Sequence, residues 1–215
     1  MGELISFDRI HKGYLAGTKG PGVVLLQEWW GLVGHICNIA DQLAAEGFLV
    51  LAPDFYGGTS TDDPTEAESL FMELNIENAA KTMGSAISFL QNKSKIDKVG
   101  TVGFCMGGQL SLYAAAVNAS VGACVNFYGV HPNVHPPISN IKCPVLGLFG
   151  KDDPMASPAV VAKLESDLSA AGVPHEFHSF EAGHAFFNDQ RPAFNQDAAD
   201  ECWKLLIPFL RKNLI

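Results

Sequence analysis

Positive charge is scarce in this 215-residue sequence, and long apolar runs are missing. Lysine and arginine number 14 against 23 aspartates and glutamates, which gives a formal net charge of −9. Such a chain is a poor partner for nucleic acid or for an anionic membrane surface, because both repel it. No apolar run approaches the roughly 20 residues that a membrane-spanning helix needs. We therefore expect neither nucleic acid nor a membrane as a partner.

Paired cysteines and a secretory leader are also lacking. The five cysteines form an odd, scattered set without a C-x-x-C pair: Cys37, Cys105, Cys124, Cys143 and Cys202. This spacing argues against a disulfide framework and against a structural zinc site. The N-terminal segment has neither the basic start nor the apolar centre of a signal peptide. Both observations indicate a cytoplasmic protein, in which all the cysteines except Cys105 lie among apolar residues as small core side chains.

What is present is a repeating pattern of apolar strands and amphipathic helices. Hydrophobic residues make up 47% of the chain and the mean hydropathy is +0.13, so we expect a single packed domain over residues 1–215. Short apolar strands that alternate with helices are typical of an α/β fold, with a mostly parallel sheet and helices on both faces. The runs predict strands at 23–27, 48–52, 98–102, 121–127, 145–149 and 175–180, and helices at 35–46, 76–90, 109–116, 157–171 and around 203–210.

The pentapeptide Gly103-Phe104-Cys105-Met106-Gly107, followed by Gly108, lies between a predicted strand and a predicted helix. It matches the nucleophile-elbow pattern G-x-S-x-G, with cysteine in place of serine. This sharp turn holds its central residue in strained dihedral angles and pushes the side chain into the open, and small flanking residues let the two arms pass. A cysteine at a strand end is usually a packing residue, but this context predicts that Cys105 is a nucleophile.

Polar residues follow four of the predicted strands, at the edge where parallel sheets place reactive groups. Glu28 follows the strand at 23–27, and Cys105 follows the strand at 98–102. Asp152 and Asp153 follow the strand at 145–149, and His184 lies just past the last strand. The order of nucleophile, acid and histidine is that of α/β-hydrolases, so we predict this fold with a cysteine triad.

Each predicted role has a chemical requirement. The thiolate is the attacking species, so Cys105 needs a base and gains from the partial positive charge of the following helix N-terminus. His184 can take and return a proton near neutral pH, and an aspartate must orient its ring. Asp153 is favoured as that aspartate because it lies three residues past the glycine that ends the strand, and Asp152 is the alternative. The backbone N–H of Met106 is placed to bind the oxyanion.

With these residues assembled, the chain resembles the dienelactone hydrolase family, the carboxymethylenebutenolidase-like α/β-hydrolases with a Cys-Asp-His triad. The resemblance implies that Glu28 deprotonates Cys105 once substrate reorients the thiol, and that the Trp29 N–H is the second oxyanion donor. It implies no metal and no organic cofactor. It covers nearly the whole chain and rests on four segments, 26–31, 52–56, 103–108 and 182–186.

Two positions depart from the family pattern. Dienelactone hydrolase itself holds its substrate carboxylate with two arginines. One lies four residues after the catalytic histidine, where this chain has Asn188, and the other lies in the segment from Asp62 to Glu77, which holds six acids and no base. We therefore expect neutral esters to be better substrates than the anionic lactone, and Glu28 to lack an ion-pair partner. Arg191 is close enough to substitute, but its ordinary interpretation is an exposed residue at a helix start. The acidic segment is expected to be a solvated helix face.

The predicted function is hydrolysis of a small ester or lactone through an acyl-cysteine, by a monomer or a homodimer. The candidate pocket residues are Trp30, Tyr56, Phe186 and Asn188, beside Trp29 and Phe187. Two alternatives stay open. One is thioester, acyl-transfer or peptide chemistry at the same site, which a substrate panel would separate. The other is a non-catalytic hydrolase-fold protein that binds a small molecule, which a covalent thiol probe would separate.

Overall fold

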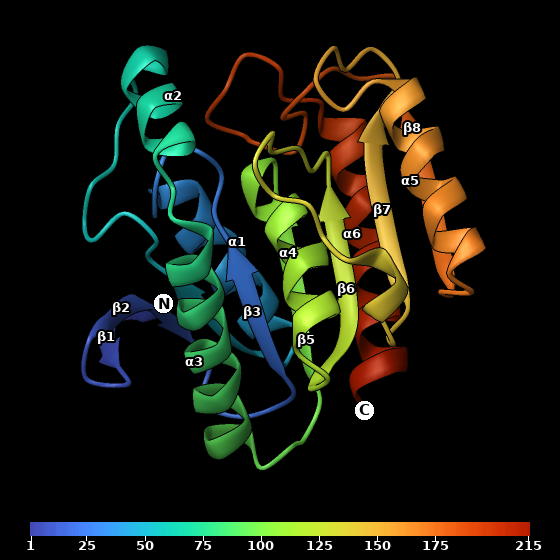
Figure 1. Ribbon diagram of the computed structural model, residues 1–215. Helices are drawn as coiled ribbons and strands as arrows, with labels where there is room; N and C mark the ends of the chain where they lie inside the picture. Colours follow the sequence, from blue (N-terminus) through green and yellow to red (C-terminus); the bar gives the residue numbers. More distant parts are fainter.

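One eight-stranded sheet runs through the computed structural model, which describes residues 1–215 (Figure 1). Its strands are β1 (Glu3–Phe7), β2 (His11–Ala16), β3 (Gly22–Leu26), β4 (Leu49–Pro53), β5 (Val99–Phe104), β6 (Val121–Phe127), β7 (Val145–Gly150) and β8 (His175–Phe180). Their order across the sheet is β1-β2-β4-β3-β5-β6-β7-β8. Every pair from β4 to β8 is parallel, whereas β2 pairs antiparallel with both β1 and β4. The predicted mostly parallel sheet is confirmed.

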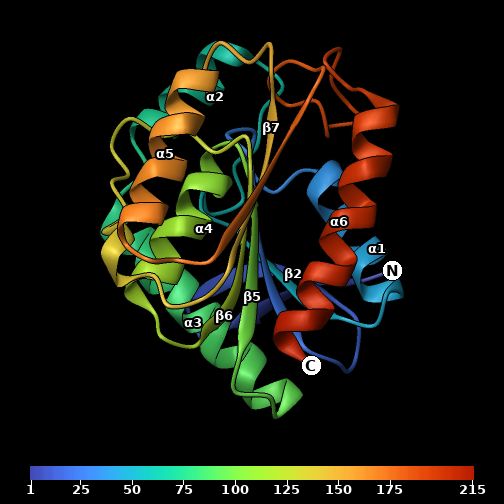
Figure 2. The ribbon, with the colours of Figure 1, turned by 90° about the vertical axis from the view of Figure 1, so that its right-hand side faces the viewer.

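Helices cover both faces of the sheet, as predicted. They are α1 (Gly34–Ala45), α2 (Pro64–Met72), α3 (Ile76–Ser94), α4 (Met106–Val117), α5 (Pro158–Ala170) and α6 (Gln196–Leu214), with a short 3₁₀ turn at Ile138–Asn140. In the edge-on view of Figure 2, α1 and α6 lie on one side, and α3, α4 and α5 on the other. None of these helices is both long enough and apolar enough to cross a membrane.

Strand β3 shows how the sequence divides the core between the two faces. Its five residues are all buried, and successive side chains point to opposite faces. Val23 and Leu25 pack with residues of α1 and α6. Val24 and Leu26 pack with residues of α3 and α4. Burial on both sides explains why the strand is continuously apolar, and it leaves the first polar residues, beginning at Gln27, for the carboxyl end of the strand.

The hairpin of β1 and β2 is not among the strands predicted from the sequence. This hairpin forms the edge of the sheet, and much of β1 is exposed, including Leu4 at 76%. A strand with one solvated face has no continuous apolar run, which was the signal used for the other strands. Two of the three residues in its turn, Asp8 and Arg9, adopt φ of 47° and 66° without the glycine that usually marks such a turn.

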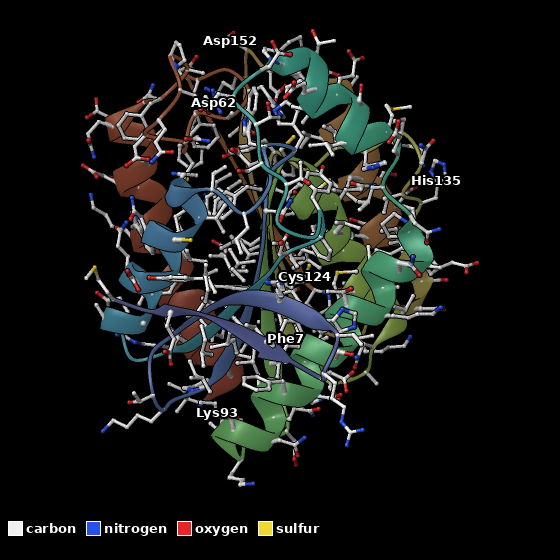
Figure 3. All side chains as sticks on the ribbon, turned by 90° about the vertical axis from the view of Figure 1, so that its left-hand side faces the viewer. Phe7, Asp62, Lys93, Cys124, His135 and Asp152 are labelled. Carbon is white, nitrogen blue, oxygen red and sulfur yellow. The ribbon has the colours of Figure 1, made fainter.

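The acidic segment forms α2 and the first turn of α3, and all six of its acids are exposed, as predicted. Asp63 caps α2 by accepting hydrogen bonds from the N–H groups of Thr65 (2.8 Å) and Glu66 (3.0 Å). Ala67 and Phe71 anchor the helix in the core. Figure 1 places α2 beyond the carboxyl ends of the strands, and Figure 3 shows Asp62 and Asp152 at this same end of the molecule.

Candidate active site

Cys105 lies at the turn between β5 and α4, in the strained conformation that an elbow requires. Its φ is 52° and its ψ is −117°, which is an unusual conformation for a residue with a side chain. The thiol residue is only 4% exposed, so the expectation that the turn would push it into the open is wrong. Tyr56, Tyr128 and His184 are its neighbours, and Cys105 contributes to the raised pKa of each of them.

The glycines of the elbow are required by close backbone approach. A Cβ on Gly103 would lie 1.9 Å from the Gly107 carbonyl oxygen, and one on Gly107 would lie 2.3 Å from the Leu26 carbonyl oxygen. A Cβ on Gly108 would lie 2.4 Å from the side-chain oxygen of Asn126. Helix α4 therefore begins at Met106, three residues before the predicted start at residue 109. Glycine is a poor helix former, and tertiary packing overrides this local preference here.

His184 and Asp153 form a hydrogen-bonded pair behind the thiol. The Nδ1 atom of His184 lies 2.7 Å from Oδ2 of Asp153, whose side chain is fully buried. Oδ1 of Asp153 accepts hydrogen bonds from the N–H groups of Met155 (2.7 Å) and Ala156 (2.9 Å). Asp152, the alternative, is exposed and its side chain makes no hydrogen bond. Of the two aspartates, only Asp153 is brought to the histidine.

The pKa shifts of this pair follow from the hydrogen bond between them. Burial alone would raise the pKa of Asp153, but His184 and the two backbone N–H groups outweigh it and lower that pKa. Burial opposes the charge on His184, but Asp153 and the nearby Cys105 outweigh it and raise the pKa of His184 to about 10. Because a carboxylate can only accept, Nδ1 carries the proton that is shared with Asp153. The other ring nitrogen, Nε2, is buried without a hydrogen-bond partner.

Glu28 is held by two neutral donors. The carboxylate is 1% exposed at the end of β3, where its Oε1 accepts from the Tyr128 hydroxyl (3.2 Å) and its Oε2 from the Asn188 amide (2.5 Å). The Asn188 oxygen accepts from the N–H of Gln190 (3.0 Å), which fixes the amide nitrogen toward Glu28. Burial, together with the negative charge of Glu28, raises the pKa of Tyr128 well above its usual range, so this phenol stays a donor. Glu28 has no ion-pair partner, as expected, but it is restrained all the same.

Tyr128 was missed by the sequence analysis. It follows the end of β6 directly, at the same edge of the sheet as the four polar residues that were predicted. It is completely buried, adopts a φ of 39°, and packs edge-on against the His184 ring with centroids 5.1 Å apart. The position past a strand end was available as a signal. The residues predicted from this position were charged residues and cysteine, although a buried tyrosine hydroxyl also needs a hydrogen-bond partner.

The two predicted oxyanion donors have free N–H groups. Trp29 lies in the turn after β3, and its N–H has no acceptor within the protein. Met106 is the first residue of α4, so its N–H has no acceptor inside the helix, and it finds none elsewhere. Unpaired backbone N–H groups at a helix N-terminus are suited to bind developing negative charge.

Several predicted pocket residues have other positions. Phe186 is fully buried and packs against Tyr128 and Phe180, and its assignment to the pocket stays a prediction. Phe187, 4% exposed, stacks on Phe104 in the same core cluster. Both side chains turn into the apolar layer beneath α6, because an aromatic ring gains most from full burial. Asn188 is itself buried, and its side chain holds Glu28.

The remaining pocket candidates lie closer to the surface. The Tyr56 hydroxyl donates to the sulfur of Met106 (3.3 Å), so its ring lies near the elbow. Trp30 is 8% exposed because the Arg191 guanidinium covers it, with Cζ 3.6 Å from the ring centroid. Arg191 lies in the loop before α6 with its side chain 21% exposed, so its interpretation as an exposed helix-start residue is wrong.

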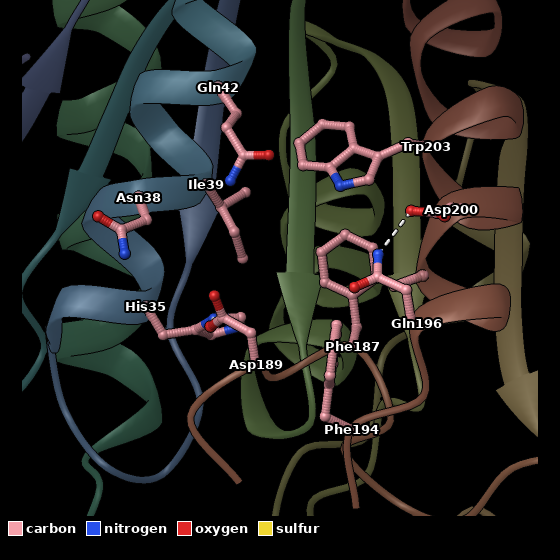
Figure 4. Close-up of a pocket in the computed structure, with 11 residues that line it drawn as sticks. His35, Asn38, Ile39, Gln42, Phe187, Asp189, Phe194, Gln196, Asp200 and Trp203 are labelled. Atoms are coloured by element: carbon pink, nitrogen blue, oxygen red, sulfur yellow. Dashed lines mark hydrogen bonds and ion pairs between the residues drawn. The ribbon is translucent and has the colours of Figure 1, made fainter.

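A separate cavity of about 270 Å³ lies between α1 and α6 (Figure 4). Figure 4 shows polar side chains from both helices, and aromatic rings from α6 and from the loop before it, around this cavity. The His35 ring meets Asp189 of that loop, with Nδ1 and Oδ1 2.8 Å apart. None of the candidate catalytic residues lines this cavity, so we do not assign the predicted chemistry to it. Its lining is His35, Asn38, Ile39, Gln42, Phe187, Asp189, Phe194, Gln196, Ala199, Asp200 and Trp203.

The other four cysteines are free thiols with different surroundings. No group of three or more histidine, cysteine or acidic side chains is arranged to hold a metal ion. Burial raises the pKa of Cys124 to about 12 and that of Cys143 to about 11. Burial also raises the pKa values of Cys37 and Cys202. These four thiols therefore stay protonated near neutral pH and are poor nucleophiles.

Comparison with known proteins finds relatives over nearly the whole chain. The sequence profile of the dienelactone hydrolase family matches residues 11–214. The "Putative carboxymethylenebutenolidase" of Aquifex aeolicus is 31% identical over 230 residues, and "Protein usf" of Aquifex pyrophilus is 30% identical over 230 residues. Each match covers 100% of both chains. The structure of the dienelactone hydrolase-like promiscuous phosphotriesterase P91 from metagenomic libraries superposes with a TM-score of 0.86 at 22% identity, covering 100% of this chain and 99% of that one. The chain therefore belongs to the dienelactone hydrolase family of carboxylic-ester hydrolases, with the α/β-hydrolase fold.

Proposed function

We propose that this protein hydrolyses a small ester or lactone through an acyl-cysteine formed on Cys105. The observation that carries the proposal is the His184–Asp153 pair, whose free Nε2 is buried next to a thiol on a strained elbow. A buried nitrogen without a hydrogen-bond partner destabilises the fold, and proton exchange with the substrate explains why His184 keeps its Nε2 unpaired. Cys105 is the nucleophile, His184 moves the proton, and Asp153 orients the ring.

The raised pKa of His184 supports a second proton carrier for the thiol. Asp153 and Cys105 raise this pKa, so the ring favours its protonated form and is suited to donate a proton to a leaving alcohol. Glu28 is then the candidate base for the thiol. Tyr128 and Asn188 leave its carboxylate as an acceptor on both oxygens. The sequence resemblance supports the same role for Glu28.

The proposed reaction has two stages. The Cys105 thiolate attacks the ester carbonyl, and the oxyanion binds to the N–H groups of Trp29 and Met106. Collapse of this intermediate breaks the ester C–O bond, and the leaving oxygen takes a proton from His184. Neutral His184 then takes a proton from water, which attacks the acyl-cysteine and releases the acid and the thiolate.

Kinetics with a matched panel of substrates tests the proposal. The panel holds a neutral lactone, an anionic lactone, a neutral aryl ester and a thioester. We expect the neutral esters to be turned over faster than the anionic lactone. We expect Cys105→Ala to abolish turnover. The control Cys37→Ala removes a half-buried thiol elsewhere and should leave turnover unchanged. Preferred turnover of the thioester, or transfer to an added alcohol or amine, would favour a thioesterase or acyltransferase. Binding without turnover would favour a non-catalytic protein.

We also propose that the protein works in the cytoplasm. All five of its cysteines are free, and the nucleophile itself must stay reduced to act. Fractionation of cells with an antibody to the protein tests this, and recovery outside the cytoplasmic fraction would contradict it.

A further inference from the structure

Arg191 places a guanidinium group over the ring of Trp30, two residues after Glu28 in the chain. It stacks on Trp30, which directly follows the predicted oxyanion donor Trp29. Its backbone N–H donates to the carbonyl of Asn188 (3.1 Å), whose side chain contacts Glu28. Two segments that are far apart in the sequence, the turn that follows Glu28 and the loop that holds Asn188, therefore meet at this arginine.

The protein uses few of the donors that Arg191 offers. A guanidinium has five N–H donors in a flat fork that matches a carboxylate or phosphate. Nη2 of Arg191 lies 2.9 Å from Oδ1 of Asp62, which is the one hydrogen bond of this side chain, and Nε is buried without a partner. The side chain of Arg191 is 21% exposed, whereas that of Asp62 is 93% exposed. Such an exposed aspartate is a weakly held partner.

The acidic loop that supplies Asp62 is tied to the same tryptophan. The N–H of Thr61 donates to the carbonyl of Trp30 (3.1 Å), and the Thr61 hydroxyl donates to the carboxylate of Glu66 (2.7 Å). Asp62 is therefore held close to Arg191 by its neighbour in the chain, and Glu66 adds a second negative charge nearby. An anion that approaches Arg191 meets this negative charge first.

We propose that Arg191 is a specificity-determining residue that can bind a carboxylate on the substrate, and that Asp62 masks it. The proposal rests on the proposed ester hydrolysis and names a cause for its preference for neutral substrates. Asp62 occupies one donor of the guanidinium, and its charge repels a second anion. A neutral ester does not experience this repulsion. Without Asp62, the donors of Arg191 become available to a substrate carboxylate.

The test compares two aryl esters that differ only at the far end of the acyl chain, where one has a carboxylate and the other the neutral carboxamide. The measured quantity is the ratio of their kcat/KM values, anionic over neutral. We expect Asp62→Asn to raise this ratio by about two- to five-fold, the size of effect that exposed ion pairs have. We expect no such rise in Glu68→Gln, which removes an exposed charge of the same acidic segment that does not contact Arg191.

A double-mutant cycle assigns the effect to Arg191. Arg191→Gln should lower the ratio, and adding Asp62→Asn in that background should raise it by less than Asp62→Asn does alone, because only the repulsion by Asp62 is then removed. An equal rise with and without Arg191, or no rise in Asp62→Asn, overturns the masking. Turnover of the neutral ester and the melting temperature show whether Arg191→Gln is folded, and Arg191→Lys, which keeps the charge, is used if it is not. If wild-type protein turns over neither ester, the proposed function fails, which is a different result from turnover with an unchanged ratio.

Discussion

The floor and the rim of the candidate site are held together by different forces. We call the buried set the site floor: Cys105, His184, Asp153, Glu28, Tyr128 and Asn188. The site rim is Trp30, Arg191 and Asp62. In the floor, each carboxylate is almost fully buried and accepts hydrogen bonds on both oxygens. In the rim, an ion pair lies between a mostly buried guanidinium and an exposed aspartate. Buried polar groups lose much when a partner is removed, whereas exposed charges lose little. Changes to the floor should therefore abolish activity or stability, and changes to the rim should only adjust preference.

The largest effect is expected from Asp153→Asn in the site floor. The amide cannot stabilise a charged imidazole and favours the wrong tautomer, so we expect kcat to fall by about 10³- to 10⁴-fold with the fold intact. Steady-state kinetics with a neutral aryl ester measures the loss. Asp152→Asn is the matched control, because its side chain is exposed and unbonded. Equal losses in the two variants would remove Asp153 from its proposed role.

The next effect is expected from Asn188→Asp, which places a second carboxylate next to Glu28. Two buried like charges cannot both stay ionised, so we expect the free energy of unfolding to drop by about 3–5 kcal/mol at neutral pH. One carboxyl of the pair will have a raised pKa in the folded state, so the loss should shrink as the pH falls. Denaturant titrations at several pH values measure this. Gln190→Glu adds the same charge at an exposed position of the same loop and should cost little. An equal cost would show that loop charge, and not the Glu28 contact, is responsible.

A smaller effect is expected from the ionisation of His184. Its folded pKa, about 10, exceeds the ordinary value of 6.5, so the stabilising charge is fully present below pH 6.5 and is lost as the pH rises toward 10. We expect the free energy of unfolding to fall by about 2 kcal/mol between about pH 6 and 8.5. Asp153→Asn should flatten this slope, because the main partner of the charge is gone. A slope that is the same in wild type and variant would contradict the pairing.

The smallest effect is expected at the site rim, from salt. Exposed charges are screened over about 8 Å at physiological ionic strength, so added salt should weaken the repulsion by Asp62. We expect the anionic-to-neutral ratio of kcat/KM to rise slightly, by less than about two-fold, between low and high salt. The Asp62→Asn variant should respond less. If salt changed kcat/KM for the neutral ester but not for the anionic one, the effect would not arise at the rim.

The floor could largely be predicted from the sequence, because its reactive residues follow strand ends in a known order. The elbow pattern predicted Cys105, the spacing after the strand-ending glycine favoured Asp153, and the position past a strand end pointed to His184. The structure brings the last two into contact. Tyr128 also follows a strand end, but it carries no charge and was therefore not predicted to belong to the site. The fold followed from continuously apolar strands. The edge hairpin of β1 and β2 has a solvated face and gave no such signal.

The rim could not be predicted, because it is a tertiary contact. Arg191 and Asp62 are 129 residues apart in the chain, and nothing local marks either as the partner of the other. The direction of Phe186 and Phe187 was equally hidden. An aromatic residue that follows a candidate catalytic histidine can line a pocket or pack in the core. Phe187 packs against β6 and α6, and Phe186 packs against Tyr128 and Phe180. Local patterns thus predict where reactive groups lie, while the loops that surround them depend on the complete fold.

The most direct test of the account is to trap the acyl-enzyme. A neutral aryl ester is mixed with the protein, the reaction is quenched in acid within its first turnovers, and the intact mass and the peptides are measured. The account predicts one added acyl group, located on the peptide that contains Cys105 and absent in Cys105→Ala. An acyl group on another residue, or steady turnover of the ester by Cys105→Ala, would contradict it.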